Sequence, residues 1–295
     1  MSGSDSAGQL DCIVRFHDMR RLSELSRCVF SLVGQLHRPL RILLALQRFT
    51  GREVAAVHAA LDPLLHLPNA PALDVLNWDD PAPADGRTAL LNLGVRAARG
   101  RYLAFLDYDD VLYPEAYAVL VGRLRVTGAA IAFATVRVVS ADIYPEFTHV
   151  TRLVTPPFDG RTLRDLLRNN FCPIHSYVID RHRVPELSFD TALAMEEDYD
   201  LLLRICAHYP ADFAQVATQI GDYYYKTDGS NTVPTEGGLT GARLAAYERV
   251  AALIETRRRT TIMAPEVQRA LGLLEPRHGL TIRAALDQLD RPERR

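Results

Sequence analysis

The order of the predicted elements indicates a layered α/β fold. Three features carry this prediction: an apolar run at 10–16, a helical pattern behind Asp18, and a second apolar run at 40–46. Together they form a β-α-β unit, in which the strands are parallel and the crossover is right-handed. Because strands and helices keep alternating to about residue 208, we expect a sheet that is covered by helices on both faces.

The individual elements have local signatures. Asp18 is placed to cap the first helix, whose apolar positions recur at helical spacing until Pro39 interrupts the pattern. Prolines are frequent over 61–83, where we expect only a brief strand at 73–76. The other predicted elements are helices at 88–99, 114–125, 162–168 and 198–208, and strands at 101–106, 131–139 and 176–180.

Composition excludes several classes of protein. Of the 295 residues, 48% are hydrophobic and 24% charged, which is typical of globular domains. The formal net charge of −2 provides no overall basic field, so a nucleic acid partner is not expected. Four scattered cysteines predict neither a disulfide framework nor a zinc site, and this fits a cytoplasmic protein. The sequence contains no run of about 18 consecutive apolar residues, so no membrane span is expected, although peripheral contact with a membrane stays open.

We expect three parts along the chain. Residues 1–9 are rich in Ser and Gly and are predicted to be a flexible tail, not a signal peptide. Residues 10–235 form the main domain, and the Ala-, Leu- and Arg-rich residues 236–295 form a C-terminal helical extension. The basic run at 257–259 is expected to be a solvated helix face, with contact to an anionic lipid-linked acceptor or membrane as the weaker alternative. A homo-oligomer formed through the helix at 241–257 also stays open.

A cluster of carboxylates follows the most apolar predicted strand. It consists of Asp107, Asp109 and Asp110. In open α/β sheets, ligands bind beyond the carboxyl ends of the strands. Neighbouring carboxylates repel one another unless a cation joins them, and hard oxygen ligands suit Mg²⁺ or Mn²⁺. Such a metal binds a diphosphate and stabilises the charge that grows on it as it leaves. The alternative is an ordinary turn whose aspartates cap the helix that enters at Pro114.

Three segments resemble glycosyltransferase family 2. The first spans 85–110 and ends in ARGRYLAFLDYDD; the second has Phe189-Asp190 followed by MEEDYDL at 195–201 and Arg204; the third is YYYKTDGSNT at 223–232. They occur in the order of the family, over roughly residues 10–232. The resemblance implies a GT-A fold, a Rossmann-like mixed sheet sandwiched by helices, here with the helical appendage. It also implies a nucleotide-sugar donor, a divalent metal and inversion at the anomeric carbon.

The resemblance also implies roles for individual carboxylates. Asp107 should contact the donor ribose or the metal, and Asp109 should ligate the metal directly. Asp198 falls where the family has its general base, which takes the proton of the acceptor hydroxyl; the alternative for Asp198 is a helix N-cap. The family's late His is replaced by Asp228, which is an acceptable oxygen ligand but also begins a turn signal, Asp228-Gly229.

The nucleotide-binding segments depart from the family pattern. After the first strand, Arg15, Phe16 and His17 replace a P-x-Y-N-like turn. We expect Arg15 to face phosphate and Phe16 or His17 to stack near the base, the alternative being an ordinary strand end. Gln47 stands where the family has paired aspartates, one of which binds the nucleobase, so uracil specificity stays open. Arg87 precedes a helix and is expected to meet the diphosphate or to lie in solvent.

The predicted function is that of an inverting, Mn²⁺- or Mg²⁺-dependent glycosyltransferase. Its donor is a nucleotide-diphosphate sugar, with UDP the commonest nucleotide of the family, and its acceptor is a hydroxyl of a glycan, a lipid-linked or a small-molecule acceptor. One alternative is a sugar-phosphate nucleotidyltransferase, which needs a Gly-rich loop that the segment 15–21 lacks. Another is a non-catalytic nucleotide-sugar-binding relative. A nicotinamide dehydrogenase is disfavoured because no G-x-G-x-x-G follows the first strand.

Overall fold

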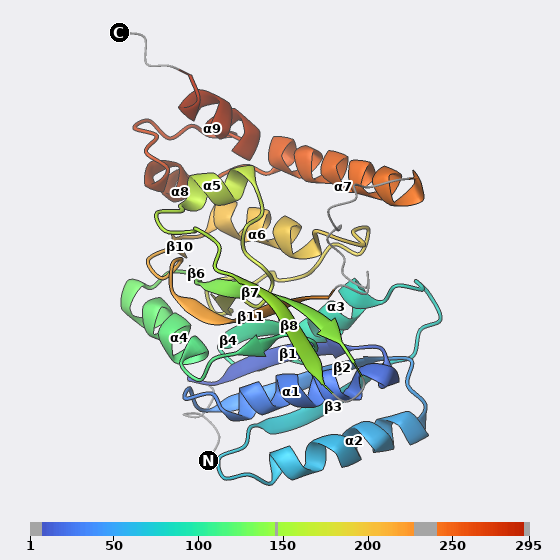
Figure 1. The fold of residues 1–295 in the computed structure, drawn as a ribbon. Coiled ribbons are helices and arrows are strands. Elements are labelled where there is room, and N and C mark those ends of the chain that lie inside the picture. Colours follow the sequence, from blue (N-terminus) through green and yellow to red (C-terminus); the bar gives the residue numbers. More distant parts are fainter. Residues whose placement is uncertain (1–7, 145–146, 227–240, 292–295) are drawn as a thin grey trace.

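A mixed sheet forms the centre of the molecule. The computed structural model describes residues 8–144, 147–226 and 241–291 (Figure 1), and the main sheet of these residues has the strand order β10-β6-β9-β4-β1-β2-β3. Strands β1 (Leu10–Phe16), β2 (Leu40–Gln47), β3 (Ala72–Trp78) and β4 (Tyr102–Asp107) are parallel. Strand β9 (Tyr177–Asp180) runs antiparallel to β4 and to β6 (Ile131–Phe133), which pairs in parallel with β10 (Ala211–Asp212). The layered α/β prediction is confirmed.

Helices bury both faces of this sheet. Cys12 and Val14 of β1 belong to the core shared with α1 (Leu22–Val33), α2 (Gly51–Leu65) and α4 (Ala116–Thr127). Ile13 belongs to the opposite core, shared with α3 (Arg87–Ala97) and α6 (Glu197–His208). Successive side chains of a strand point to opposite faces, so a strand buried on both sides is apolar at nearly every position. This accounts for the continuous apolar runs in the sequence.

A second, smaller sheet leans against the first and has the order β5-β11-β7-β8. Its strands are β5 (Val111–Leu112), β7 (Thr135–Ile143), β8 (Thr148–Val154) and β11 (Gln219–Lys226). The predicted strand at 131–139 is in fact two strands, β6 and β7, because the chain leaves one sheet for the other at Ala134. Strand β11 pairs with β5, directly behind the aspartate cluster. Residues more than 100 positions apart therefore meet at the site.

Helix α2 is absent from the predicted elements. Its start carries a local signal, since Thr50 and Glu53 form a reciprocal capping box. Val57 and Leu61 are its buried positions, and Pro63 lies within the helix, in the proline-rich stretch that was expected to be largely irregular.

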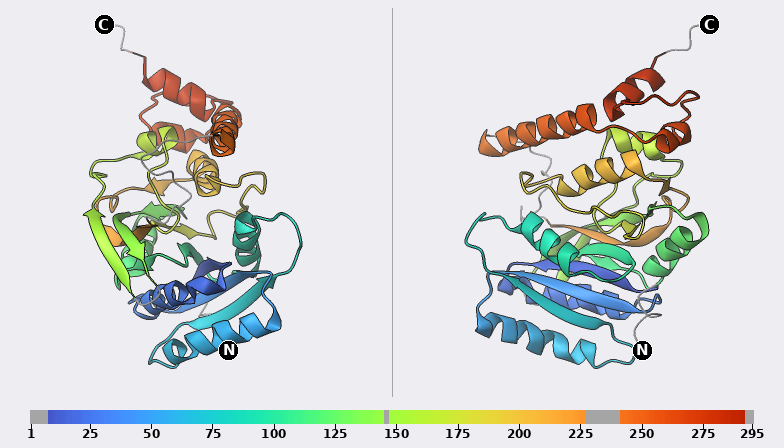
Figure 2. Two further views of the ribbon diagram at one scale, coloured as in Figure 1. Left: turned by 45° about the vertical axis from the view of Figure 1, so that its right-hand side comes forward. Right: turned by 180° about the vertical axis from the view of Figure 1, so that it is seen from behind.

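The C-terminal helices form a further layer. Helices α7 (Gly241–Thr260), α8 (Pro265–Ala270) and α9 (Ile282–Leu289) stack beyond α5 (Leu163–Arg168) and α6, at the end of the molecule opposite α2 (Figures 1 and 2). Val250, Ile254 and Ile282 join the same core as α6. In the part of the chain that the structure describes, no helix combines the length and apolarity needed to cross a membrane.

Candidate active site

Arg15 and Asp107 meet at the carboxyl ends of β1 and β4, where they are register partners. Nε of Arg15 lies 2.6 Å from Oδ1 of Asp107, and Nη2 lies 3.1 Å from Oδ2. Nη1 donates to Oε1 of Glu197 at 2.7 Å, at the start of α6. Burial alone would raise the pKa of Asp107, but the Arg15 guanidinium outweighs it and the pKa lies below its usual range. Asp107 is therefore a carboxylate whose two oxygens are already engaged.

A cavity of about 400 Å³ opens at this edge of the sheet. It collects most of the side chains that the sequence predicts for the donor and the metal, namely Arg15, His17, Gln47, Arg87, Asp107 and Asp109. It is also lined by residues that the sequence analysis did not assign, among them Arg20, Arg21, Tyr223, Tyr224 and Lys226. Cations and carboxylates face one cavity, which suits a charged ligand such as a diphosphate with its counter-ion.

Phe16 is not part of this cavity, so of the two residues predicted to stack near the base, Phe16 or His17, only His17 lines it. The Phe16 ring is fully buried and lies edge-on to Phe49 and Tyr108, with centroids 5.5 and 5.2 Å away. Side chains alternate along a strand, so Phe16 faces the core with Val14 while Arg15 and His17 line the cavity.

Gln47 holds the loop that follows β3. Its amide nitrogen donates to the carbonyl oxygen of Ala84 at 2.8 Å, and its oxygen accepts from the backbone N–H of Gly86 at 3.2 Å. A Cβ at Gly86 would lie 2.4 Å from the Trp78 ring, so only glycine allows the loop to come this close. The guanidinium carbon of Arg48 lies over the same ring, 4.6 Å from its centroid. Gln47 thus lines the cavity and shapes its wall.

Arg87 is the first residue of α3 and lines the cavity. Its Nε lies 3.0 Å from Oδ2 of Asp85, which lines the same wall. The side chain is about one-third exposed, at 31%. It is thus neither sequestered in the core nor directed into bulk solvent, and it is within reach of an anion in the cavity.

Asp109 is paired with a buried lysine. Nζ of Lys226, at the end of β11, lies 2.5 Å from Oδ2 of Asp109 and 2.9 Å from Oε2 of Glu24 on α1. The Lys226 side chain is 3% exposed, whereas that of Asp109 is 22% exposed. No local pattern marks this contact, since 117 positions separate the two residues.

Asp110 and His175 form a buried layer beneath the cavity, which sequence analysis did not detect. Oδ1 of Asp110 accepts from the backbone N–H of Tyr224 at 2.8 Å, and Nδ1 of His175 lies 3.4 Å from Oδ2. Burial, with the charges of Asp109 and Asp107, raises the pKa of Asp110 well above its usual value. Burial lowers the pKa of His175 to about 4. Both shifts favour neutral groups, so this layer adds little net charge under the site.

Asp198 lies in the first turn of α6, beside the cavity but outside its lining. Its neighbour Glu197 is held by Arg15, which connects this turn to the cavity wall. Burial, and then the charges of Glu197 and Glu196, raise the pKa of Asp198 well above its usual value. A carboxylate with a raised pKa is a stronger base, which is the property that the predicted role requires.

The C-terminal helices brace this turn of α6, and the predicted solvated face at 257–259 is wrong for two of its three arginines. Arg257 donates to Asp200 at 2.5 Å and to Asp190 at 2.9 Å. Arg258 donates to the carbonyl oxygen of Leu167 at 3.0 Å and to the Tyr199 hydroxyl at 2.8 Å. These side chains point inward because α7 packs on α6, so neighbouring carboxylates and carbonyls replace water.

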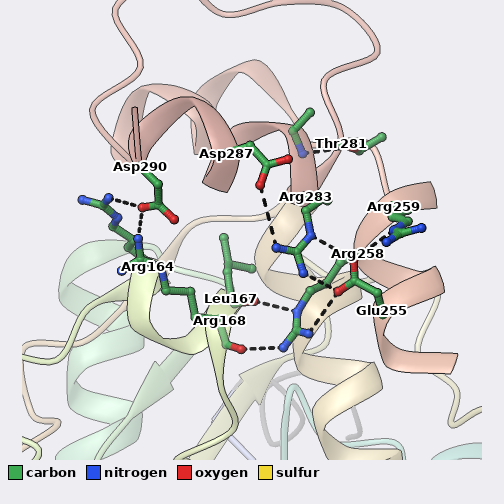
Figure 3. A network of polar contacts seen from close by, with 11 residues as sticks. Arg164, Leu167, Arg168, Glu255, Arg258, Arg259, Thr281, Arg283, Asp287 and Asp290 are labelled. Carbon is green, nitrogen blue, oxygen red and sulfur yellow. Dashed lines mark hydrogen bonds and ion pairs between the residues drawn. The ribbon is translucent and has the colours of Figure 1, made fainter. Parts of the chain in front are cut away.

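Figure 3 shows the surrounding polar network of α5, α7 and α9. Glu255 of α7 accepts from Arg283 of α9 at 2.9 Å, and Arg259 pairs with the same carboxylate. Asp290 pairs with Arg164 and Arg168 of α5. Ion pairs therefore tie α9 to α5 and to α7, in addition to the apolar contacts that these helices share with α6.

The described residues offer a partial site for a divalent metal. Within them, no three His, Cys, Asp or Glu side chains converge to hold an ion by themselves, and the predicted ligand Asp228 lies outside the described residues. Both oxygens of Asp107 are engaged by Arg15, whereas Asp109, which also lines the cavity, pairs with Lys226 through Oδ2. Mg²⁺ usually keeps several waters and is bound by one or two carboxylates plus substrate phosphates. The residues fit a cation that shares its coordination with a diphosphate.

Comparison with known sequences finds similarity to one family in the central part of the chain. Residues 83–183 match the profile of glycosyl transferase family 2. The succinoglycan biosynthesis protein ExoO of Rhizobium meliloti (strain 1021) is 32% identical over 125 residues, a match that covers 39% of this chain and 36% of that protein. The profile match contains the first of the three motif segments, residues 85–110, and agrees there with the predicted family.

Solved structures confirm the fold. TarS 1–349 of S. aureus in complex with UDP-GlcNAc superposes with a TM-score of 0.60 at 12% identity, over 97% of this chain and 77% of that chain. The mannosyltransferase PcManGT of Pyrobaculum calidifontis, in complex with GDP-Man and Mn²⁺, superposes with a TM-score of 0.52 at 15% identity. This match covers 94% of this chain and 84% of that chain. The chain therefore has the GT-A fold.

Proposed function

We propose that this chain is an inverting glycosyltransferase that moves a sugar from a nucleoside-diphosphate donor to an acceptor hydroxyl. The observation that carries the proposal is the cavity at the ends of β1 and β4. Its cations and carboxylates are joined, through Arg15 and Glu197, to the turn that bears Asp198. The side chains that would bind the donor and the candidate base Asp198 thus lie in adjoining parts of one site.

Arg15 and Arg87 bind the donor diphosphate in this proposal, and Asp109 holds Mn²⁺ or Mg²⁺. Bound there, the metal stabilises the negative charge on the leaving diphosphate. PcManGT with Mn²⁺ supports the cation, and TarS with UDP-GlcNAc supports UDP as the first nucleotide to test. Gln47 and the loop at 79–86 border the cavity where the base would lie.

Asp198 takes the proton of the acceptor hydroxyl as that oxygen attacks the anomeric carbon. Its raised pKa strengthens it as a base. The reacting sugar acquires oxocarbenium character, which the departing diphosphate balances. The similarity to ExoO, a succinoglycan biosynthesis protein, supports a glycan or a lipid-linked sugar as the acceptor to test first.

Two substitutions test the proposal with a panel of UDP- and GDP-sugars. Asp109→Ala should abolish the Mn²⁺-dependent part of nucleotide binding in calorimetry. Asp198→Asn should keep binding and lose transfer by about 10²- to 10⁴-fold, the range for removing a general base. Asp62→Asn, on the exposed surface of α2, is the control and should match the wild type. Pyrophosphate release from a nucleoside triphosphate would point instead to a nucleotidyltransferase, and binding without any turnover to a non-catalytic relative.

A further inference from the structure

Lys226 is the single lysine among the 34 lysine and arginine residues of the sequence; the others are all arginines. It is 2% exposed and lies at the end of β11, inside the wall of the candidate active site. Its ammonium group lies between Asp109 and Glu24, 2.5 and 2.9 Å from their oxygens, and 5.5 Å from the centre of the Tyr108 ring. A buried ammonium is stable only with such partners, so these contacts are integral to the wall.

The oxygen of Asp109 that contacts Lys226 belongs to the carboxylate that would bind the metal. An ammonium at 2.5 Å neutralises this carboxylate and repels a second cation. A divalent cation that arrives alone must therefore displace Lys226 from Asp109 and place two positive centres side by side. A diphosphate changes this balance, because its negative oxygens provide partners for the metal and for the ammonium together.

We propose, resting on the transferase function above, that Lys226 is a built-in counter-ion that occupies Asp109 and makes cation binding conditional on the donor. With the site otherwise empty, Lys226 holds Asp109 and the cation binds weakly. When the nucleoside diphosphate enters, Lys226 turns to its phosphate oxygens and Asp109 becomes a metal ligand. Binding of the cation and of the nucleotide is then strongly cooperative, and by linkage each raises the affinity for the other by the same factor.

Lysine suits this role better than arginine would. Its ammonium is a compact point charge on a flexible stem, so it can change partners with small movements of the chain. Arg15 illustrates the contrast, because its planar guanidinium grips both oxygens of Asp107 in a fixed geometry. Of the cations in the cavity, Arg15 is thus fixed on Asp107, whereas Lys226 is exchangeable on Asp109.

Manganese binding tests this without any turnover. Free Mn²⁺ is measured by electron paramagnetic resonance for the wild type and for Lys226→Met, with no nucleotide, with UDP and with GDP. The wild type should bind Mn²⁺ weakly alone and tightly with one of the nucleotides. Lys226→Met should bind Mn²⁺ alone at least about ten-fold more tightly than the wild type, within the 5- to 150-fold range of typical coupling between sites.

Two further variants separate the local pair from general charge. Lys226→Arg keeps the positive charge beside Asp109 and should retain weak Mn²⁺ binding in the absence of nucleotide. Arg259→Met removes a positive charge from α7, outside the lining of the cavity, where that side chain is 69% exposed. It should change Mn²⁺ affinity by less than about two-fold, because exposed charges are screened.

The single lysine also permits a test on the unaltered protein. A chain labelled with ¹³C at lysine Cε gives one lysine signal, that of Lys226. Its chemical shift should stay in place when Mg²⁺ alone is added and should move when Mg²⁺ and the nucleotide are added together. An equal movement with Mg²⁺ alone would overturn the proposal, and this measurement holds even if Lys226→Met fails to fold.

The outcomes distinguish this proposal from the function on which it rests. If the wild type binds Mn²⁺ only with nucleotide but Lys226→Met gains no affinity for Mn²⁺ alone, the role of Lys226 is refuted and metal-assisted transfer stands. If the wild type binds Mn²⁺ alone as tightly as with nucleotide, the role of Lys226 is refuted as well. If no Mn²⁺ binds under any condition, the metal site and the role of Lys226 both fall.

Discussion

The guanidinium of Arg15 grips both carboxylate oxygens of Asp107 and reaches Glu197 with its remaining terminal nitrogen. One side chain thereby joins the end of β1 to the aspartate cluster after β4 and to the first turn of α6. The donor half of the candidate site and the turn that bears Asp198 are held in one arrangement. This relationship leads to the first prediction.

Arg15→Met should lower both stability and activity. It leaves Asp107 and Glu197 without their shared cation in a largely buried setting, and breaking a buried pair costs about 3 kcal/mol. Urea unfolding measures this loss. Donor affinity, measured by calorimetry, should fall as well, since Arg15 lines the cavity. Unchanged stability would show that the two carboxylates find other partners. Arg15→Lys, which restores charge but not the two-pronged contact, should recover only part of both properties.

Asp198→Asn should stabilise the fold at neutral pH. The folded-state pKa of Asp198 is raised by burial and by Glu197 and Glu196, so ionisation opposes folding above the unfolded pKa of about 3.9. The penalty grows as the pH rises from that value to the folded pKa, and it is absent below about pH 3.9. The unfolding temperature of the variant should therefore exceed that of the wild type at pH 7, and the two should converge near pH 3.5. A constant difference at all pH values would contradict the raised pKa.

The acid limb of the rate profile should report the same group. Asp198 must be ionised to accept a proton, so turnover in the wild type should fall as the pH drops through its raised pKa. The rate of any residual transfer by Asp198→Asn should lose this limb. Glu196→Gln, which removes a neighbouring negative charge, should move the limb to lower pH without abolishing transfer. A limb that stays in place in both variants would assign it to another group.

Arg258→Met should loosen the turn that carries Asp198. The side chain is 14% exposed and donates to Leu167, Arg168 and Tyr199, and losing such charged hydrogen bonds costs about 2–3 kcal/mol. Turnover should fall while donor affinity is kept, because the contacts lie on the α6 side of the site. Arg259→Met is the matched control: its side chain is 69% exposed, and the change should stay within about 0.5 kcal/mol. Equal effects of the two substitutions would show that Arg258 does not stabilise the turn that carries Asp198.

Gly94→Ala should destabilise the main sheet. A Cβ at this position in α3 would lie 2.7 Å from the Ile13 side chain on β1, and such overpacking costs about 1–3 kcal/mol. Gly122→Ala in α4 meets no atom within 4 Å and should be neutral or stabilising by up to about 1 kcal/mol. Denaturant unfolding of the two variants compares them directly. If Gly94→Ala proves neutral, helix and sheet shift apart more readily than close packing implies.

The sequence alone determined the features that depend on neighbouring residues. Apolar runs predicted the buried strands β1, β2 and β4, because a strand covered on both faces is apolar throughout. The motif at 98–110 placed the aspartates at a strand end, and 195–201 placed Asp198 at a helix start. Local patterns were weaker for the second sheet, since β8 is largely exposed and β11 follows a run of turns. The residues of the capping box at the start of α2, Thr50 and Glu53, favour a helix there, but the prolines that follow are typical of a loop.

Only the tertiary structure decided which charges meet. The partners of Asp107, Asp109 and Asp110, namely Arg15, Lys226 and His175, come from other strands and loops, and Arg258 reaches Tyr199 across 59 positions. An ionic side chain carries no local sign of its partner, because long-range pairing follows from how sheets and helices stack and not from spacing along the chain. Burial strengthens these pairings by removing water, and burial is itself a property of the assembled fold.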